Sequence, residues 1–136
     1  MRIKIFTLIL FVVSFGVIAC SDNETAKNVD PKTLADTIDV QTAASLQGRD
    51  DVILIDVREQ SEYDAGHIPD ITLIPMSEIQ NRVSEIPTDV EVILTCRSGN
   101  RSGQVHAYLT ELGYDNVHNM EGGILAWEAA GLEVEH

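Results

Sequence analysis

The chain has 136 residues and a formal net charge of −13, because 22 acidic residues outnumber 9 basic ones. Its 44% hydrophobic content, with 9 glycines and 4 prolines, is that of one folded domain and excludes a disordered or collagen-like chain. The acidic charge repels polyphosphate, so we expect no nucleic-acid partner, and the 2 cysteines exclude a disulfide-framework protein.

The N-terminus predicts an export signal. Two basic residues precede an apolar run at residues 5–19, which only Thr7 and Ser14 interrupt. As a helix this run reaches about 22 Å, which is short of the ~30 Å hydrocarbon core of a membrane. A basic start followed by a short apolar run is typical of a secretory signal peptide, which we place at residues 1–19. A buried N-terminal helix is the alternative, and it fits less well because the run is apolar on all sides.

A cysteine follows the predicted signal peptide. The segment VIAC, residues 17–20, resembles a bacterial lipobox, although Val17 stands where leucine is usual. The resemblance implies that the peptide is cut before Cys20, that Cys20 is acylated, and that the protein is anchored to a membrane on the periplasmic side. Ser21 rather than aspartate follows the cysteine, which favours the outer membrane. Ordinary signal cleavage, with Cys20 as a free thiol, stays open.

The rest of the chain alternates short apolar runs with amphipathic stretches. Residues 20–36 are polar and predict a tether, so the domain is expected at residues 37–136. Strands are predicted at residues 52–55, 71–74, 90–95 and 116–119. Helices are predicted at residues 40–46, 77–85, 103–112 and 124–130. Strands separated by such helices predict an α/β fold with a central parallel β-sheet and helices on both faces.

Details of the predicted helices can be tested. Ser77 and Gln80 form a capping-box pattern that opens the second helix. In the third helix, Val105, Leu109 and Leu112 recur at helical spacing, which predicts one buried face. In an open parallel sheet, functional groups gather where the strands end, and here they follow the strands at 52–55 and 90–95.

Cys96 directly follows the predicted strand at 90–95 and precedes a polar loop that enters a helix. Backbone N–H groups converge at such a position, Gly99 lets the backbone approach closely, and Arg97 and Arg101 add positive charge. Lowering a thiol pKa from about 8.5 to about 6.5 needs roughly 2.7 kcal/mol. A helix terminus supplies about 0.3–1 kcal/mol, whereas a hydrogen bond to a charged group supplies about 1.5–3 kcal/mol. The sequence therefore predicts a Cys96 thiolate held chiefly by N–H groups of the loop.

Three segments, in the same order along the chain, resemble motifs of the rhodanese family of sulfurtransferases. The active-site loop of that family resembles CRSGNRS at residues 96–102. Its upstream motif resembles DVR…EY..GHIP at residues 56–69, and its C-terminal motif resembles GG…W..AGL at residues 122–132. After the upstream motif the family usually has glycine, alanine and asparagine, whereas this chain has DIT at residues 70–72. We expect this departure to alter the rim of the substrate pocket.

The resemblance implies a ping-pong sulfurtransferase with a rhodanese-like fold. Cys96 would be the catalytic nucleophile and would carry sulfur as a persulfide from a donor such as thiosulfate to a thiol or cyanide. Six loop residues would bind the substrate: Arg97, Ser98, Gly99, Asn100, Arg101 and Ser102. The two arginines among them would orient the anionic donor, while Asp56 and Arg58 would support the neighbouring loops. No cofactor and no metal is implied, and we expect a monomer.

Two other functions stay open. Phosphatases and arsenate reductases of related fold have five residues between the cysteine and the arginine, whereas four separate Cys96 from Arg101. A non-catalytic sulfur-binding or redox module is the second alternative, but inactive rhodanese modules commonly lose the cysteine that this chain keeps. His106, His118 and His136 lack ligand-like spacing, and His67 is expected to be structural because a thiolate needs no base.

Overall fold

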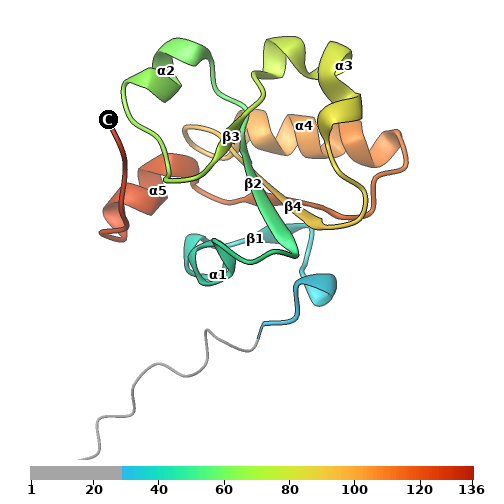
Figure 1. Ribbon diagram of the computed structural model, residues 1–136, viewed down its shortest axis with the longest axis horizontal. Helices are drawn as coiled ribbons and strands as arrows, with labels where there is room; N and C mark the ends of the chain where they lie inside the picture. The colour runs from blue at the N-terminus through green and yellow to red at the C-terminus, as the bar shows by residue number, and fades with distance from the viewer. Residues whose placement is uncertain (1–28) are drawn as a thin grey trace, which may run out of the picture.

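The structure, a computed structural model, describes residues 29–136 (Figure 1). The predicted signal peptide and Cys20 lie outside the described residues. Five parallel strands form one sheet in the order β1-β5-β4-β2-β3, which confirms the predicted parallel α/β architecture. The strands are β1 (Thr37–Ile38), β2 (Val52–Asp56), β3 (Thr72–Leu73), β4 (Glu91–Thr95) and β5 (Val117–Met120).

Helices cover both faces of the sheet, as Figure 1 shows with α1 and α5 toward the lower left and α3 and α4 at the upper right. The helices are α1 (Val40–Leu46), α2 (Gln60–Asp64), α3 (Ile79–Arg82), α4 (Asn100–Glu111) and α5 (Gly123–Ala129). Short 3₁₀ turns occur at η2 (Pro31–Thr33), η3 (Met76–Glu78) and η4 (Val83–Glu85).

The two faces of the sheet bury separate apolar clusters, because successive side chains of a strand point to opposite faces. Leu54 of β2 and Ile93 of β4 pack with α1 and α5, where Trp127 is fully buried. Ile55 and Leu94, the next residues along the same strands, pack with α3 and α4. Burial on both faces explains why these strands are continuous apolar runs in the sequence.

The last helix, α5, is displaced by one residue from the predicted 124–130, and the second and third predicted helices differ more. The capping box at Ser77 is wrong, because no side-chain cap bond forms there and Ser77 Oγ donates to Glu59 Oε2 at 3.2 Å instead. The segment that follows is η3, α3 and η4 rather than one helix. Helix α4 begins at Asn100, three residues earlier than predicted, and Leu112 lies beyond its end with 51% of its surface exposed. Leu112 is therefore not part of the buried face formed by Val105 and Leu109.

The part of the predicted tether that the structure describes, residues 29–36, packs against the domain. Pro31 is buried in η2, and Val29 and Leu34 contact the apolar cluster of α1 and α5. The buried His118 ring shares a hydrogen bond of 2.8 Å with the Ala35 carbonyl oxygen. Residues 29–36 thus pack with the domain that was predicted to begin at residue 37. Within residues 29–136, no helix has the length and apolar character to cross a membrane.

Candidate active site

Cys96 lies directly after β4, with 1% of its surface exposed. Its Sγ accepts a hydrogen bond from the Gly99 N–H at 3.1 Å and one from the Ser102 hydroxyl at 3.4 Å. Gly99 is the N-cap of α4 and has a φ of +91°, a left-handed conformation that glycine adopts without strain. This turn brings the backbone back over the sulfur, as the sequence predicted.

Helix α5 donates hydrogen bonds to two carbonyl groups of the same loop. The N–H of Ile124 donates to the Cys96 carbonyl oxygen at 2.9 Å, and the N–H of Leu125 donates to the Arg97 carbonyl oxygen at 3.2 Å. Gly123 makes this approach possible, because a Cβ at its φ of +58° would overlap the Cys96 and Arg97 carbonyl groups. The first turn of α5 therefore fixes how the cysteine loop presents its backbone.

Asn119 of β5 donates a hydrogen bond to a third carbonyl group of the loop, that of Gly99. Its Nδ2 donates to the Gly99 carbonyl oxygen at 3.2 Å, while its own Oδ1 is buried without a partner among the described residues. The same Gly99 carbonyl oxygen accepts a hydrogen bond from the Gly103 N–H at 3.1 Å, so Asn119 contacts the start of α4 next to the cysteine loop. Asn119 was not predicted to have this role, because nothing in a short strand marks a residue that contacts a loop twenty positions away.

These contacts act on the pKa of Cys96 in opposite directions. Burial is the largest single influence and raises the pKa, because it disfavours the thiolate. Hydrogen bonds from the Ser102 hydroxyl and from the N–H groups of Ser102, Ser98 and Gly99 lower it, and together they outweigh burial. The pKa of Cys96 therefore lies below its ordinary value, through hydrogen bonds of the loop, which agrees with the expectation from the sequence.

Arg101 was expected to orient the anionic donor, but its guanidinium is paired with a carboxylate of the protein. Its two Nη atoms lie 2.7 Å from the two carboxylate oxygens of Glu62, which is the third residue of α2. The Arg101 guanidinium lowers the pKa of Glu62 to about 2, and the Glu62 carboxylate raises the pKa of Arg101. The guanidinium is thus engaged in a bidentate ion pair between α4 and α2. Glu62 belongs to the motif at residues 56–69, but its pairing with Arg101 was not predicted.

The side chains of Arg97, Ser98 and Asn100 are exposed and make no hydrogen bond to Sγ. Arg97 and Ser98 are exposed, and Arg97 makes no ion pair or side-chain hydrogen bond within residues 29–136. The Asn100 side chain accepts a hydrogen bond from Gln104 on the surface of α4 at 2.8 Å. Of the six loop residues predicted to bind the substrate, Gly99 and Ser102 donate hydrogen bonds to Sγ. Arg97 is the loop arginine whose guanidinium has no ion pair within residues 29–136.

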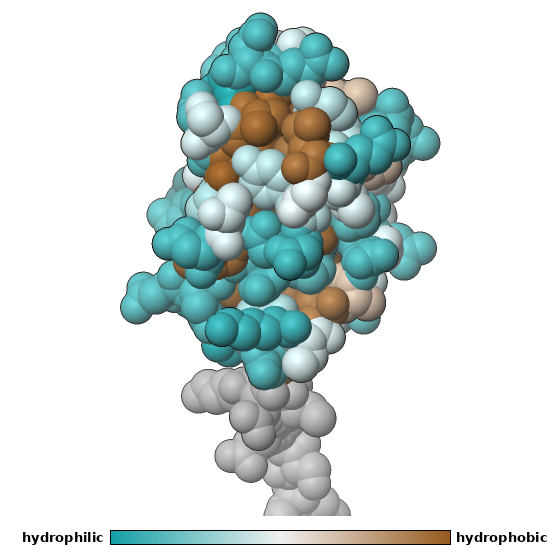
Figure 2. Space-filling model, turned by 90° about the vertical axis from the view of Figure 1, so that its right-hand side faces the viewer, coloured by the Kyte–Doolittle hydropathy of each residue, from teal (hydrophilic) through white to brown (hydrophobic). Residues whose placement is uncertain are grey.

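A hollow of about 300 Å³ lies beside the cysteine loop, and its lining includes Arg97, Glu62, Leu125 and Glu128. A second hollow of about 390 Å³ lies between η3, α3 and α4 and contains none of residues 96–102. Figure 2, which views the side that carries α3, shows a hydrophobic patch near the top of a mainly hydrophilic face. The departure from the family motif at residues 70–72 was expected to alter the rim of the substrate pocket. Asp70 and Thr72 instead line a third hollow, and neither lines the hollow beside Arg97.

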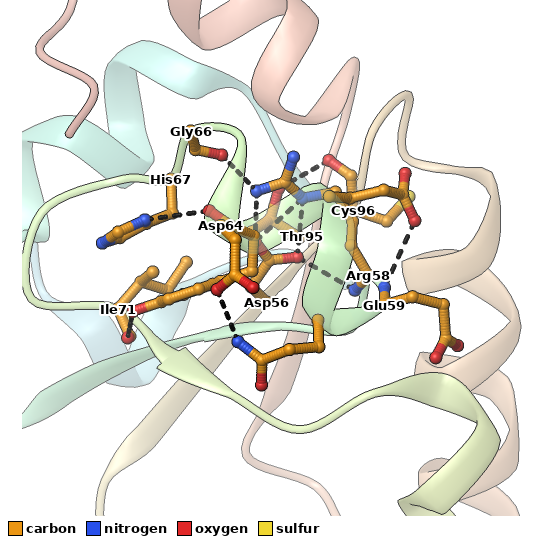
Figure 3. A network of polar contacts seen from close by, with 12 residues as sticks. Asp56, Arg58, Glu59, Asp64, Gly66, His67, Ile71, Thr95 and Cys96 are labelled. Atoms are coloured by element: carbon orange, nitrogen blue, oxygen red, sulfur yellow. Dashed lines mark hydrogen bonds and ion pairs between the residues drawn. The ribbon is translucent and has the colours of Figure 1, made fainter. Parts of the chain in front are cut away.

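The end of β2 carries a buried ion pair (Figure 3). Arg58 Nη2 lies 2.7 Å from Asp56 Oδ2, and the two side chains are only 6% and 2% exposed. The same Nη2 donates to the Gly66 carbonyl oxygen at 2.7 Å, and the Arg58 N–H donates to Asp56 Oδ1 at 3.0 Å. The pair thus joins the strand end to the turn at Gly66, a geometry that suits the supporting role expected from the sequence.

His67 and His118 make structural contacts. His67 stacks on Tyr63 with ring centroids 3.9 Å apart, its Nδ1 lies 3.0 Å from the Tyr63 carbonyl oxygen, and its Nε2 lies 3.4 Å from Glu135 Oε2. The ring of His118 bridges Ala35 and Glu91. In the part of the chain that the structure describes, no three His, Cys, Asp or Glu side chains are grouped to hold a metal ion.

Comparisons with known proteins agree on one family. The family model of the rhodanese-like domain matches residues 39–130. A sulfurtransferase of Allochromatium vinosum is 47% identical over 89 residues, which are 65% of this chain and 83% of that protein. A thiosulfate sulfurtransferase, GlpE, of Pseudoalteromonas translucida is 34% identical over 96 residues, which are 71% of this chain and 91% of that protein.

Solved structures resemble the fold as well. A rhodanese-like domain protein of Staphylococcus aureus superposes with a TM-score of 0.64 at 32% identity, over 75% of this chain and 100% of that one. A thiosulfate sulfurtransferase of Pseudomonas aeruginosa superposes with a TM-score of 0.65 at 30% identity, over 75% of this chain and 19% of that one. The sheet order, the cysteine loop and the matched residues therefore point to the same group of proteins.

Proposed function

The chain belongs to the rhodanese-like family, and from that premise we propose that it is a sulfurtransferase in which Cys96 carries sulfane sulfur as a persulfide. The observation that supports this most directly is the pair of hydrogen bonds to Sγ, at 3.1 Å from the Gly99 N–H and 3.4 Å from the Ser102 hydroxyl. Donors in this position stabilise a thiolate, and they equally suit the terminal sulfur of a persulfide anion. The named relatives include a thiosulfate sulfurtransferase, so thiosulfate is the reference donor.

In the first half-reaction the Cys96 thiolate attacks the outer sulfur of thiosulfate. A bond forms between Sγ and that sulfur, the sulfur–sulfur bond of thiosulfate breaks, and sulfite leaves with the electron pair. The exposed Arg97 guanidinium attracts the anionic donor. Hydrogen bonds from the N–H groups of Ser98 and Gly99 stabilise the negative charge on sulfur. We assign no general base, because the lowered pKa of Cys96 favours the thiolate that acts as the nucleophile.

In the second half-reaction a thiophilic acceptor attacks the terminal sulfur of the persulfide. Cyanide takes the sulfur and leaves as thiocyanate, or a thiolate takes it and leaves as a new persulfide. In either case the Cys96 thiolate departs with the electron pair of the broken bond. The hydrogen bonds that lower the pKa of Cys96 also make it a better leaving group.

Intact-mass analysis of the full chain with Cys20→Ser tests this function, because Cys96 is then its sole thiol. Thiosulfate should add the mass of one sulfur atom, cyanide should remove it, and Cys96→Ser should abolish both steps, since a serine hydroxyl without an adjacent base is a poor nucleophile. Efficient hydrolysis of an aryl phosphate without any sulfur adduct would replace the proposal with a phosphatase function.

We propose further that the protein is exported and anchored through an acylated Cys20, facing the periplasm. The support is the sequence at residues 1–20 alone. Two or more acyl chains hold a protein stably on a membrane, since each buried CH₂ contributes about 0.8 kcal/mol. Labelled palmitate should be incorporated into the wild-type chain but not into Cys20→Ala, and an unmodified wild-type protein in the soluble periplasmic fraction would contradict the anchor.

A further inference from the structure

The ion pair between Arg101 and Glu62 has the geometry of an arginine that binds an anion. Arg101 is the second residue of α4, which begins directly after the Gly99 turn over Cys96. Its two Nη atoms lie 2.7 Å from the two carboxylate oxygens of Glu62. A guanidinium presents the same planar pair of donors to a carboxylate, a phosphate or a sulfate group. Glu62 therefore occupies the donors with which Arg101 would otherwise bind an oxyanion.

Glu62 is held in this position from its own helix as well. Its Oε2 accepts a hydrogen bond from the Glu59 N–H at 3.2 Å, within the capping box that opens α2. Hydrogen bonds from Arg101, above all, lower the pKa of Glu62 to about 2, so the carboxylate is charged near neutral pH. An anion from solution must displace a carboxylate that is already charged and in place, so it competes for Arg101 at a disadvantage.

The pair lies near the reacting sulfur. The pKa of Arg101 is raised foremost by the Glu62 carboxylate and also by the negative charge of the Cys96 thiolate, so the guanidinium lies within electrostatic reach of Sγ. The hollow of about 300 Å³ beside the cysteine loop has Glu62 in its lining but not Arg101. The arginines that do line it are Arg58, which is in a buried ion pair, and the exposed Arg97. The second arginine of the loop is thus withdrawn from ligands in the hollow.

We propose that Glu62 is a specificity-determining residue, which occupies the Arg101 guanidinium and so weakens the binding of oxyanion groups, such as sulfate, phosphate or carboxylate, at the cysteine loop. This inference rests on the sulfurtransferase function and assigns a residue outside the loop that sets which ligands reach Cys96. Glu62 takes no part in a covalent step and acts only through Arg101. Thiosulfate carries an oxyanion group at one end, so Glu62 also limits how tightly this donor binds before it reacts.

The test compares two alkylating reagents that differ only in a charged group. Iodoacetate and iodoacetamide are reacted near neutral pH with the full chain carrying Cys20→Ser, and modification of Cys96 is followed by intact mass at constant ionic strength. A change in the pKa of Cys96 affects both rates alike, so their ratio reports on the carboxylate of the reagent. We expect Glu62→Gln to raise the ratio of iodoacetate to iodoacetamide rates about fivefold, the upper range for a partly exposed ion pair.

Inorganic sulfate provides a second probe. The sulfate concentration that halves the rate of iodoacetamide alkylation should fall in Glu62→Gln by about the same factor of five, because sulfate bound by Arg101 covers Cys96. The rate of persulfide formation at low thiosulfate concentration should rise in the same variant.

Two further variants separate the role of Glu62 from a general effect of charge. Glu128 lines the same hollow, is exposed and makes no ion pair within residues 29–136, so Glu128→Gln removes an equal charge and leaves the Arg101 pair intact. It should raise the alkylation ratio less than about twofold, as expected for an exposed charge. Adding Arg101→Gln to Glu62→Gln should return the ratio to near the wild-type value, which a merely structural effect of the first substitution would not do.

The outcomes separate the inference from the function beneath it. An alkylation ratio that rises no more in Glu62→Gln than in Glu128→Gln, a ratio that stays raised in the double variant, or an unchanged response to sulfate would overturn the role of Glu62 and leave sulfur transfer intact. If thiosulfate forms no persulfide on Cys96 in either the wild type or Glu62→Gln, the sulfurtransferase function fails, whereas the alkylation and sulfate results still decide how Glu62 acts on oxyanion binding.

Discussion

The carboxyl ends of β2 and β4 lie side by side in the sheet, with Asp56 in register with Thr95, yet they are built in opposite ways. At the end of β2, Asp56 and Arg58 satisfy one another in a buried ion pair. At the end of β4, the carbonyls of the cysteine loop accept hydrogen bonds from α5 and Asn119, and the Gly99 N–H and the Ser102 hydroxyl donate to Cys96 Sγ. In the Asp56–Arg58 pair both charges are satisfied, so the pair supports the fold. The hydrogen bonds to Cys96 Sγ all come from donors, so they stabilise an anion.

This difference predicts that stability and reactivity can be changed separately. Substitutions at the end of β2 should lower the free energy of unfolding without a specific effect on the chemistry of Cys96. Substitutions in the cysteine loop should change the pKa of Cys96 with a smaller effect on stability. The expectations below run from the largest change to the smallest.

Arg58→Ala should give the largest loss of stability, because it leaves the Asp56 carboxylate buried without its ionic partner. Breaking a buried pair in this way costs about 3–5 kcal/mol. Arg49→Ala is the control, since its pair with Asp51 lies at the surface and its other contact, with the Val29 carbonyl oxygen at 3.2 Å, leaves no buried charge behind; it should lower the free energy of unfolding much less than Arg58→Ala does. Urea unfolding of both variants measures the difference, and equal effects would show that the end of β2 is not the support assigned to it.

Gly123→Ala should change both properties at once. Its Cβ would overlap the carbonyl groups of Cys96 and Arg97, so α5 and the cysteine loop must move apart. We expect a loss of about 2 kcal/mol in the free energy of unfolding, within the range for strained backbone substitutions, together with a higher pKa of Cys96. Gly131→Ala is the control, because its φ is also positive at +73° but its Cβ would meet no atom within 4 Å. Equal effects of the two variants on the pKa of Cys96 would contradict the link between α5 and the loop.

Glu62→Gln should have a small effect that depends on pH. The pKa of Glu62 falls on folding to about 2 from its ordinary value of 4.5. A carboxyl of this kind stabilises the fold fully above its ordinary pKa, and the contribution is lost as the pH falls from about 4.5 to about 2. Near neutral pH we expect Glu62→Gln to lower the free energy of unfolding by about 1 kcal/mol or less, since the Arg101 pair is partly exposed.

The difference between wild type and Glu62→Gln in urea unfolding should shrink toward zero below about pH 3. Glu111→Gln, at an exposed glutamate without an ion pair in residues 29–136, should show no such pH dependence. A difference that stays constant from neutral to acid pH would mean that Arg101 does not depend on the Glu62 charge.

Local sequence pattern was sufficient for much of the fold. β2 and β4 are found where continuous apolar runs placed them, because both faces of each strand are buried, and α1 is found at the predicted residues 40–46. β1 and α2 were not predicted. β1 has two residues and is defined by backbone pairing with β5, and α2 is a polar five-residue turn that buries none of its side chains.

The candidate site was predictable in its centre and not in its surroundings. Cys96, Gly99 and Ser102 lie within one loop, so their contacts follow from spacing along the chain. The Arg101–Glu62 pair joins residues 39 positions apart, and the Asn119 contact joins residues 20 apart. Such contacts depend on the order of strands and on where helices begin, which short-range pattern does not fix.

The central claim is that hydrogen bonds of the loop, rather than its arginines, activate Cys96. The most direct measurement is the rate of iodoacetamide alkylation against pH for the full chain with Cys20→Ser. We predict a midpoint below the ~8.5 of a free thiol, raised by about one pH unit in Ser102→Ala, since a hydrogen bond to a charged group is worth about 1.5–3 kcal/mol and this one is long. Arg101→Ala should shift it much less. A wild-type midpoint at or above that of a free thiol, or a larger shift in Arg101→Ala than in Ser102→Ala, would contradict the claim.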